Sequence, residues 1–289
     1  MLESIGNFLN EVYSEWRRDN ALTHGAALAY YTLFSMAPLL VLIIAIAGLA
    51  LGRAVAEGEL VAKIKDLIGP DSARTVEGMI SEVSSPATGI IATAVSLATM
   101  LFGASGVFGQ LQSSLNQIWD TIVADGTPPR GVVRRRLASF GLILGIGMLL
   151  FLSLMVSAAL AALHDLLARH LPQLSGALPL LNTALSFVLT TSLFAMIYKV
   201  LPDVELHWRD VWVGAAVTAV LFSVGRTLIG VYLGRAGTAS VYGAAGSLVV
   251  LLLWIYYSAQ ILFIGAEFTE VYSRRYGSRR AAAEPVPRI

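Results

Sequence analysis

Near its C-terminus the chain carries a long uncharged stretch that constrains its fold more than any other feature. From Ala236 to Ala266 it has 31 residues without a charged side chain or a histidine. A helix of about 20 apolar residues is enough to cross a hydrocarbon core about 30 Å thick. The stretch is followed by Arg274 and Arg275. We therefore predict that residues 240–272 are the last span of a multi-pass membrane protein.

The composition favours a membrane location and excludes several kinds of chemistry. Of the 289 residues, 56% are hydrophobic and 13% are charged, whereas soluble domains carry about 25% charged residues. A net charge of +1 gives no basic surface of the kind that binds nucleic acid. Without cysteine the chain forms no disulfide and has no cysteine-ligated metal. The first residues do not resemble a cleaved signal peptide, so we expect the first span to insert uncleaved.

The apolar runs predict an all-α integral membrane protein with six transmembrane helices. The predicted spans are residues 25–52, 88–109, 137–163, 179–198, 211–233 and 240–272. Pro38 lies inside the first span and removes a backbone donor, so we expect a kink near Ser35–Pro38. Two GxxxG pairs, Gly141–Gly145 and Gly230–Gly234, allow close helix contact either within one chain or between the chains of an oligomer.

Three stretches are too polar to span. Residues 1–19 place apolar side chains at helical spacing, which predicts an amphipathic helix in the membrane interface. Residues 53–85 carry two apolar faces separated by a turn at Gly69, which predicts a hairpin of two amphipathic helices outside the membrane. Residues 273–289 are a basic tail that we expect to be disordered. Residues 1–272 then make up a single six-span membrane domain.

The basic residues set the orientation. With both termini in the cytoplasm, the cytoplasmic segments hold 13 of the 20 lysines and arginines and the opposite side holds 6. Basic residues near membrane spans are retained in the cytoplasm. We therefore predict that both termini are cytoplasmic and that the 53–85 hairpin is extracytoplasmic. The remaining basic residue, Arg226, lies within the fifth span.

Four stretches of the sequence stand out as a set. They are LAYYTLFSMAPLL (28–40), SLNQIW (114–119), WRDVWVGAAVTAVLF (208–222) and YGAAGSLVVLLLWIYYSAQILFIGAEFT (242–269). In this order they resemble the YihY/BrkB family of bacterial inner-membrane proteins, over about residues 20–272. The resemblance implies six helices and a location in the bacterial cytoplasmic (inner) membrane. Members of the family have been labelled ribonuclease BN, linked to serum resistance and virulence, and proposed to transport lipids or lipopolysaccharide precursors.

Arg226 is the most informative single residue of the sequence. An arginine in the middle of a span costs about 2.5–3.5 kcal/mol on insertion scales, so such a residue normally faces a bundle interior or an aqueous cavity. In the predicted orientation Arg226 lies in the outer half of the fifth span. Either its guanidinium meets the phosphate or carboxylate of a substrate headgroup, or it is a structural residue bonded to carbonyl groups at a helix end.

Three further sets of residues within the predicted spans are candidates for a substrate path. Tyr256, Gln260 and Glu267 share one face of the sixth span, and Asn182, Ser186 and Thr190 follow each other at i, i+4 and i+8 on the fourth. Such stripes either line a hydrophilic route or join helices by hydrogen bonds. In the first span Tyr30, Tyr31 and Ser35 precede Pro38. They form either a gate or, for the tyrosines, an interfacial anchor.

The sequence offers no motif for a cofactor, a metal or catalysis. The four histidines, His24, His164, His170 and His207, have no metal-binding spacing. Asp120, Asp125, Asp203 and Asp210 are scattered over loops, where each is explained as a cap or a turn. The arginine clusters 134–136 and 274–280 lie where topology alone puts basic residues, and they are not accompanied by an aromatic platform for RNA. We therefore expect neither an enzyme, a ribonuclease included, nor a nucleic-acid partner.

Three hypotheses follow for the function. The first is an inner-membrane transporter or flippase-like protein for an amphipathic anionic substrate, such as a lipid or an envelope precursor, with Arg226 holding the headgroup. The second is an envelope scaffold that does not transport and acts through protein partners, for which the 53–85 hairpin and the tail would matter more. A ribonuclease is the least favoured.

Overall fold

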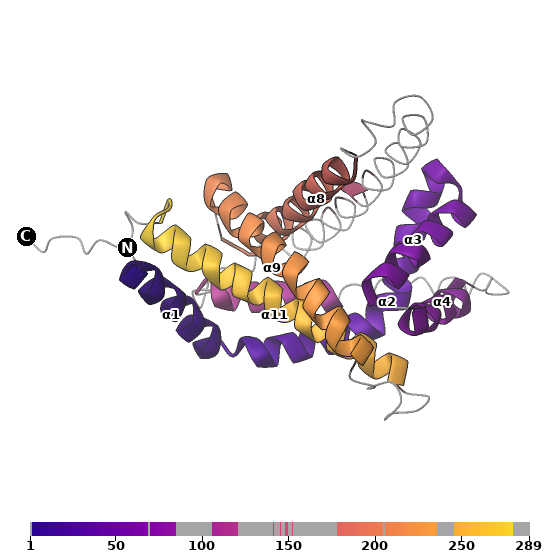
Figure 1. The fold of residues 1–289 in the computed structure, drawn as a ribbon, viewed down its shortest axis with the longest axis horizontal. Coiled ribbons are helices and arrows are strands. Elements are labelled where there is room, and N and C mark those ends of the chain that lie inside the picture. Colours follow the sequence, from indigo (N-terminus) through magenta and orange to yellow (C-terminus); the bar gives the residue numbers. More distant parts are fainter. Residues whose placement is uncertain are drawn as a thin grey trace, which may run out of the picture.

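The described part of the protein consists of helices and the turns between them (Figure 1). The computed structural model describes residues 2–68, 70–84, 106–120, 178–204, 206–235 and 246–279, with five isolated residues between 141 and 152. Its helices are α1 (Leu2–Arg18), α2 (Ala21–Leu51), α3 (Arg53–Ile68), α4 (Pro70–Ser84), α8 (Leu178–Val200), α9 (Trp208–Arg235) and α11 (Gly246–Arg275). Residues 106–118 form one more helix.

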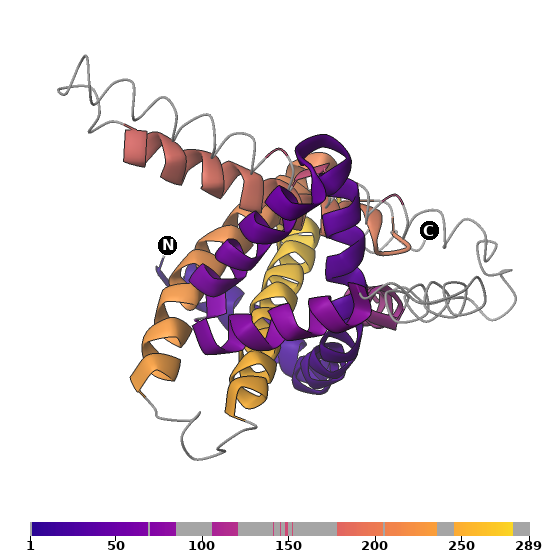
Figure 2. The ribbon, with the colours of Figure 1, turned by 90° about the vertical axis from the view of Figure 1, so that its right-hand side faces the viewer.

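Helix α11 is the centre of the described bundle. It packs against α9, α2, α1 and α4 (Figures 1 and 2), and 16 of its 30 residues are buried. The contact with α9 is the closest, because small residues face hydroxyl groups across it. A methyl group on Gly265 would overlap the hydroxyls of Thr218 and Tyr198, and one on Gly214 would overlap Thr269. Such small residues let two membrane helices approach until their backbones almost touch.

Three helices of the described chain are long and apolar enough to cross a membrane. They are Leu180–Val200, Trp208–Ile229 and Gly246–Arg275, which match the predicted fourth, fifth and sixth spans. The predicted first span lies within α2, whose 31 residues form one helix through Pro38; the kink stays a prediction. Most of the predicted second and third spans, 88–109 and 137–163, lies outside the described residues.

The predicted N-terminal amphipathic helix forms as α1, and it is anchored to the bundle. Phe8 and Val12 bury one apolar row against Val271 of α11. A second row, Ile5, Leu9 and Tyr13, stays exposed. Because this row is apolar, it fits the predicted position of α1 in the membrane interface.

The two helices predicted between residues 53 and 85 form as α3 and α4, but they do not stand apart from the spans. Val76 and Ile80 of α4 belong to one core cluster with Leu251 and Ile255 of α11. The hydroxyl of Thr75 also lies 2.8 Å from that of Ser247. The hairpin therefore packs against the first turns of α11 as a part of the bundle.

The start of the tail differs from the expected disorder. Ser273–Arg275 complete α11, and the backbone N–H and the hydroxyl of Ser278 both donate to Asp210 at the start of α9. The cause is a tertiary contact, since Asp210 is buried and needs donors. Residues 280–289 of the predicted tail lie outside the described residues.

The α9–α11 contact predicts a strong effect of a single methyl group. Gly265→Ala should lower the free energy of unfolding by about 1–3 kcal/mol, as overpacking does in dense cores. Thermal unfolding of the detergent-solubilised protein measures this change. The matched control is Gly78→Ala in α4, where a methyl group meets open space; alanine should leave stability unchanged or raise it by up to about 1 kcal/mol. Equal melting temperatures for Gly265→Ala and wild type would contradict the packing.

Candidate functional site

Arg226 lies on the exposed surface of α9, among apolar side chains. Its neighbours along the helix, Val224 and Leu228, are 55% and 61% exposed. Arg226 makes no ion pair with any residue that the structure describes, and the nearby hydroxyls of Ser223 and Thr227 donate to backbone carbonyls of α9. The structure thus leaves a guanidinium within a candidate membrane span without an anionic partner from the described chain.

The position of Arg226 on α9 explains its exposure. Ala215, Ala219, Phe222 and Arg226 follow each other on one helical face. The first two are fully buried and Phe222 contacts Phe194 of α8, with 5.7 Å between ring centroids. Arg226 is the next residue of the face that packs against α8, and it is exposed. The cover that α8 gives to this face therefore ends between Phe222 and Arg226.

Helix α8 diverges from α9 at this level. The two helices pack closely where Tyr198 lies 3.0 Å from Thr218, between hydroxyl oxygens, and where Phe194 meets Phe222. Beyond Thr190 the side chains of α8 are mostly exposed, Leu180 by 75%, and Figure 2 shows α8 projecting away from α9. We call this divergence, from Thr190 and Arg226 outward, the α8–α9 opening.

The polar stripe predicted on the fourth span runs along the part of α8 that diverges from α9. Tyr198, Phe194 and Thr190 follow at four-residue spacing, and the first two contact α9. By the same register Thr190 is level with Arg226. Thr190 is partly buried and donates 2.8 Å to the carbonyl of Ser186, while Ser186 and Asn182 are exposed further out. Thr190 and Arg226 therefore lie at corresponding levels of two diverging helices, and the described contacts do not join the α8 stripe to Arg226.

The stripe on α11 lies elsewhere, against α2. Gln260 Nε2 donates 3.3 Å to the carbonyl of Ala21. Gly25 allows this approach, because a methyl group there would overlap the Gln260 amide and touch the Tyr256 ring. Glu267 is 1% exposed, and neither of its carboxylate oxygens has a hydrogen-bond partner among the described residues. In the described chain the α11 stripe and the α8 stripe do not line one common route.

The two tyrosines before Pro38 lie on the outside of α2, and Ser35 is buried and bonded to the α2 backbone. Tyr30 is exposed, and its ring is 4.7 Å from that of Phe34, between centroids. Tyr31 packs beside Gly106, at the start of the helix 106–118. Ser35 is buried and donates 2.7 Å to the carbonyl of Tyr31. Pro38 lies within α2. The gate that we expected around it stays a prediction.

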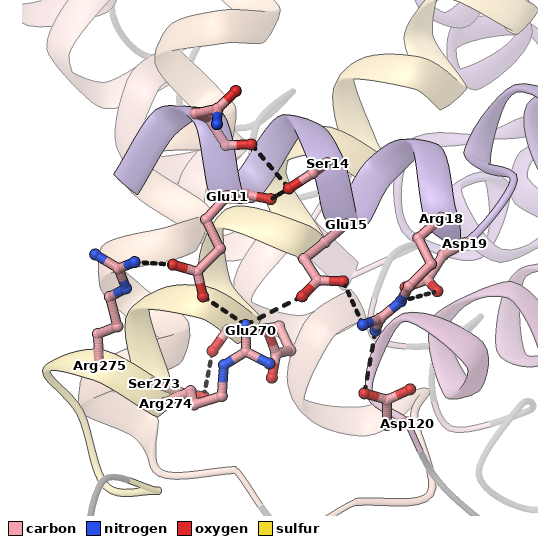
Figure 3. A network of polar contacts seen from close by, with 11 residues as sticks. Glu11, Ser14, Glu15, Arg18, Asp19, Asp120, Glu270, Ser273, Arg274 and Arg275 are labelled. Atoms are coloured by element: carbon pink, nitrogen blue, oxygen red, sulfur yellow. Dashed lines mark hydrogen bonds and ion pairs between the residues drawn. The ribbon is translucent and has the colours of Figure 1, made fainter. Parts of the chain in front are cut away.

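A charged network that the sequence analysis did not predict joins α1 to the end of α11 (Figure 3). Arg274 bonds Glu11 at 2.7 Å and Glu15 at 3.3 Å, and it lies 3.7 Å from Glu270. Arg275 pairs with the other oxygen of Glu11. The sequence signal was present as two i, i+4 pairs, Glu11 with Glu15 and Glu270 with Arg274, but their juxtaposition requires the tertiary fold.

The network continues at the turn between α1 and α2. Arg18 pairs with Glu15 at 2.8 Å, with Asp19 at 3.5 Å and with Asp120 at 3.4 Å. Burial raises the pKa of the Asp19 carboxyl above its ordinary value, although the charge of Arg18 opposes the shift. Asp19 Oδ2 has no hydrogen-bond partner. The turn thus carries a buried carboxyl group of which one oxygen is bonded to Arg18 and the other has no partner among the described residues.

The SLNQIW stretch has a structural role at the same end of the bundle. Asn116 accepts 2.7 Å from the backbone N–H of Asp203 and donates 3.0 Å to its carboxylate. Gln117 donates 3.1 Å to the carbonyl of Asp19 and lies 2.8 Å from the His24 ring nitrogen. Trp119 is fully buried under the Arg279 guanidinium. These contacts gather the α1–α2 turn, the α8–α9 loop and the end of α11 at one end of the described bundle.

The first GxxxG pair acts at least partly within one chain. A methyl group on Gly145 would overlap the Met196 sulfur of α8. Gly141 meets no neighbour within 4 Å. Over the residues that the structure describes, no three histidine, aspartate or glutamate side chains are placed to hold a metal ion.

Comparison with known proteins gives the family. Residues 12–289 match the family described as Virulence factor BrkB. The chain belongs to this family. Similar proteins include a UPF0761 membrane protein of Alkalilimnicola ehrlichii, 26% identical over 94% of this chain and 59% of the relative. Another is a UPF0761 membrane protein of Pseudomonas paraeruginosa, 27% identical over 93% of this chain and 63% of the relative.

The family assignment confirms the resemblance and the membrane location. The BrkB chain spans about three-fifths of the length of these curated relatives. A third relative, a UPF0761 membrane protein of Ralstonia nicotianae, is 29% identical over 79% of this chain and 50% of its own length. No solved structure matches the chain. The protein is thus a membrane protein of the BrkB type.

The α8–α9 opening predicts a reactive position on α8. Because the chain has no cysteine, Ser186→Cys introduces a unique thiol into the opening. If Arg226 and the α8 stripe keep water there, the thiol ionises and reacts quickly with a small maleimide in membranes. The matched control is Ala195→Cys, at a position 1% exposed on the same helix, which should react at least tenfold more slowly. Equal rates at the two positions would contradict the opening.

Proposed function

We propose that this BrkB-family protein is a transporter or flippase-like protein of the bacterial cytoplasmic membrane, for an anionic amphiphile such as a lipid or an envelope precursor. The observation that carries the proposal is the place of Arg226. It is exposed within a candidate membrane span, it faces the α8–α9 opening, and it has no anionic partner among the described residues.

An exposed arginine in a span needs an anion. Leaving the guanidinium unpaired in the hydrocarbon region costs about 2.5–3.5 kcal/mol on insertion scales. A phosphate fits the guanidinium fork by two parallel hydrogen bonds. A lipid headgroup is such a partner, and it reaches Arg226 sideways from the bilayer, past the exposed Val224 and Leu228. The charge and the apolar surface around it are what support an anionic amphiphile as the proposed substrate class.

The α8 stripe supplies neutral hydrogen-bonding groups beside this charge. Thr190 is level with Arg226, and Ser186 and Asn182 extend outward from it along α8. Hydroxyl and amide groups replace part of the water around a headgroup, while the acyl chains stay in the bilayer. No nucleotide-binding motif accompanies these spans, so movement on this proposal is passive, ion-coupled or driven by a partner.

The test is lipid scrambling in proteoliposomes with a fluorescent anionic phospholipid. Wild type should speed the exchange of headgroups between leaflets. Arg226→Ala should lower the rate per reconstituted molecule at least tenfold, since the headgroup would lose hydrogen bonds to a charged group, which contribute about 1.5–3 kcal/mol. Arg226→Lys should retain part of the rate, because it keeps the charge but loses the fork.

The matched control is Arg209→Ala, which removes an exposed arginine at the other end of α9 and should leave the rate unchanged. Full activity of Arg226→Ala at equal folded yield would overturn the role of this residue. No exchange above empty liposomes with wild type would overturn lipid as the substrate and favour the scaffold hypothesis.

A further inference from the structure

The α11 stripe and the α1–α2 turn hold buried oxygen atoms that lack hydrogen-bond donors among the residues that the structure describes. They are Gln260 Oε1, both carboxylate oxygens of Glu267, and Asp19 Oδ2. The three side chains are 8%, 1% and 6% exposed. All four atoms are acceptors, if the carboxylates are ionised. Buried polar atoms in proteins are almost always paired, so this junction of α11 with the start of α2 calls for a donor that the described side chains do not supply.

The charges around Glu267 make the need stronger. The carboxylates of Asp19, Glu270 and Glu15 act on it with the same sign, and the charge of Arg18 opposes them. The Arg18 side chain is 55% exposed and already pairs with Glu15, Asp19 and Asp120. Arg274, the next cation, bonds Glu11 and Glu15 and lies beside Glu270. Neither arginine is left to neutralise Glu267.

A carboxylate in this position has two ways to avoid the cost of a buried charge. It binds a metal cation, or it takes up a proton and becomes neutral. A metal ion needs several oxygen ligands converging on one point, and the described acidic residues and histidines do not form such a group. Binding a proton, in contrast, requires only one carboxyl group, and Glu267 supplies it.

We propose that Glu267 is a buried proton-binding site, closed by the α1–α2 turn and by the start of α2. In the conformation seen here the Glu267 carboxyl is neutral and provides the O–H donor that its surroundings lack, next to the Asp19 carboxyl. Glu270, although also buried, differs because Arg274 lies 3.7 Å from it.

The walls of the site belong to elements that can separate. Asn20, between α1 and α2, adopts a left-handed backbone conformation at φ 53°, which is costly for a residue other than glycine. The start of α2 is held to α11 by the Gln260–Ala21 bond. If α2 moved away at this point, the Glu267 carboxyl would meet water and release its proton. Using this step to couple transport to a proton gradient rests on the proposed function; the proton site itself does not.

The first experiment is infrared spectroscopy of the full-length protein in detergent at neutral pH. Wild type should show the C=O band of a protonated carboxyl group, and Glu267→Gln should lack it. The matched control is Glu270→Gln, which removes a paired buried carboxylate of the same helix and should keep the band. An unchanged band in Glu267→Gln would overturn the proposal.

The second experiment follows thermal unfolding against pH. If folded Glu267 holds a proton that the unfolded chain releases, stability is greatest at low pH and is lost as the pH rises. Glu267→Gln mimics the neutral acid, so its melting temperature should fall less than that of wild type between pH 5 and 9. Asp19→Asn removes a neighbouring carboxyl and should keep the infrared band.

Two outcomes would contradict the proton site. A Glu267→Gln variant that unfolds more easily than wild type at every pH would mean that the group is ionised in the fold. Stabilisation of wild type, but not of Glu267→Gln, when sodium replaces potassium at constant ionic strength would assign the site to a metal cation. Neither readout depends on lipid scrambling, so a failed transport assay and a failed proton site remain distinguishable.

Discussion

The close contact between α9 and α11 is the constraint on which the described bundle depends. Lipid chains are as apolar as leucine, so the hydrophobic effect gives membrane helices little reason to associate, and shape and hydrogen bonds decide. Here Gly214 faces Thr269, and Gly265 faces Thr218 and Tyr198. Tyr198 of α8 also donates 2.8 Å to the Leu262 carbonyl of α11. One tyrosine thereby joins the third helix to the pair, and α2, α1 and α4 pack against α11.

Hydrogen bonds at one end of the bundle, which we call the polar cap, fix the relative positions of its segments. Apolar contacts alone would let these segments shift along one another. Asp203 is held by Asn116 and Gln112, and Asp210 by Ser278. Each bond joins segments far apart in the sequence. Because hydrogen bonds depend on direction, they determine the register of these segments more sharply than apolar packing does. Asn116 and Gln117 of SLNQIW contribute to this cap.

Much of the helical layout was predictable from the sequence, and the sites were predictable only in part. Length and hydropathy gave α8, α9 and α11, because the bilayer imposes one length on every span. Helical spacing gave α1 and the α3–α4 pair. It also placed Glu267 and Gln260 on one face of α11. It could not show that Gln260 bonds to α2, or that this face and Asn182 of α8 do not line one common route. The ion pairs of Arg274 with Glu11 and Glu15 depend on how α1 docks on α11, which no local pattern encodes. The order at Ser278 depends in the same way on Asp210, 68 residues earlier.

The two proposed sites lie on opposite sides of one rigid helix pair. Arg226 faces the divergence of α8 from α9, whereas Glu267 is closed by the start of α2. The α9–α11 contact itself leaves no room for sliding, because hydroxyl groups already fill the space beside its glycines. Relative motion is therefore expected in the elements on either flank, α8 on one side and α2 with α1 on the other.

α8 stays attached to the pair at Tyr198 and Phe194, so its free half can swing about that end. The start of α2 is held both by apolar packing of Ala21 and Leu28 and by the Gln260–Ala21 hydrogen bond, and the loss of a proton from Glu267 would add a negative charge to an already acidic junction. Electrostatic repulsion would then open the α2 flank while leaving the α9–α11 pair intact.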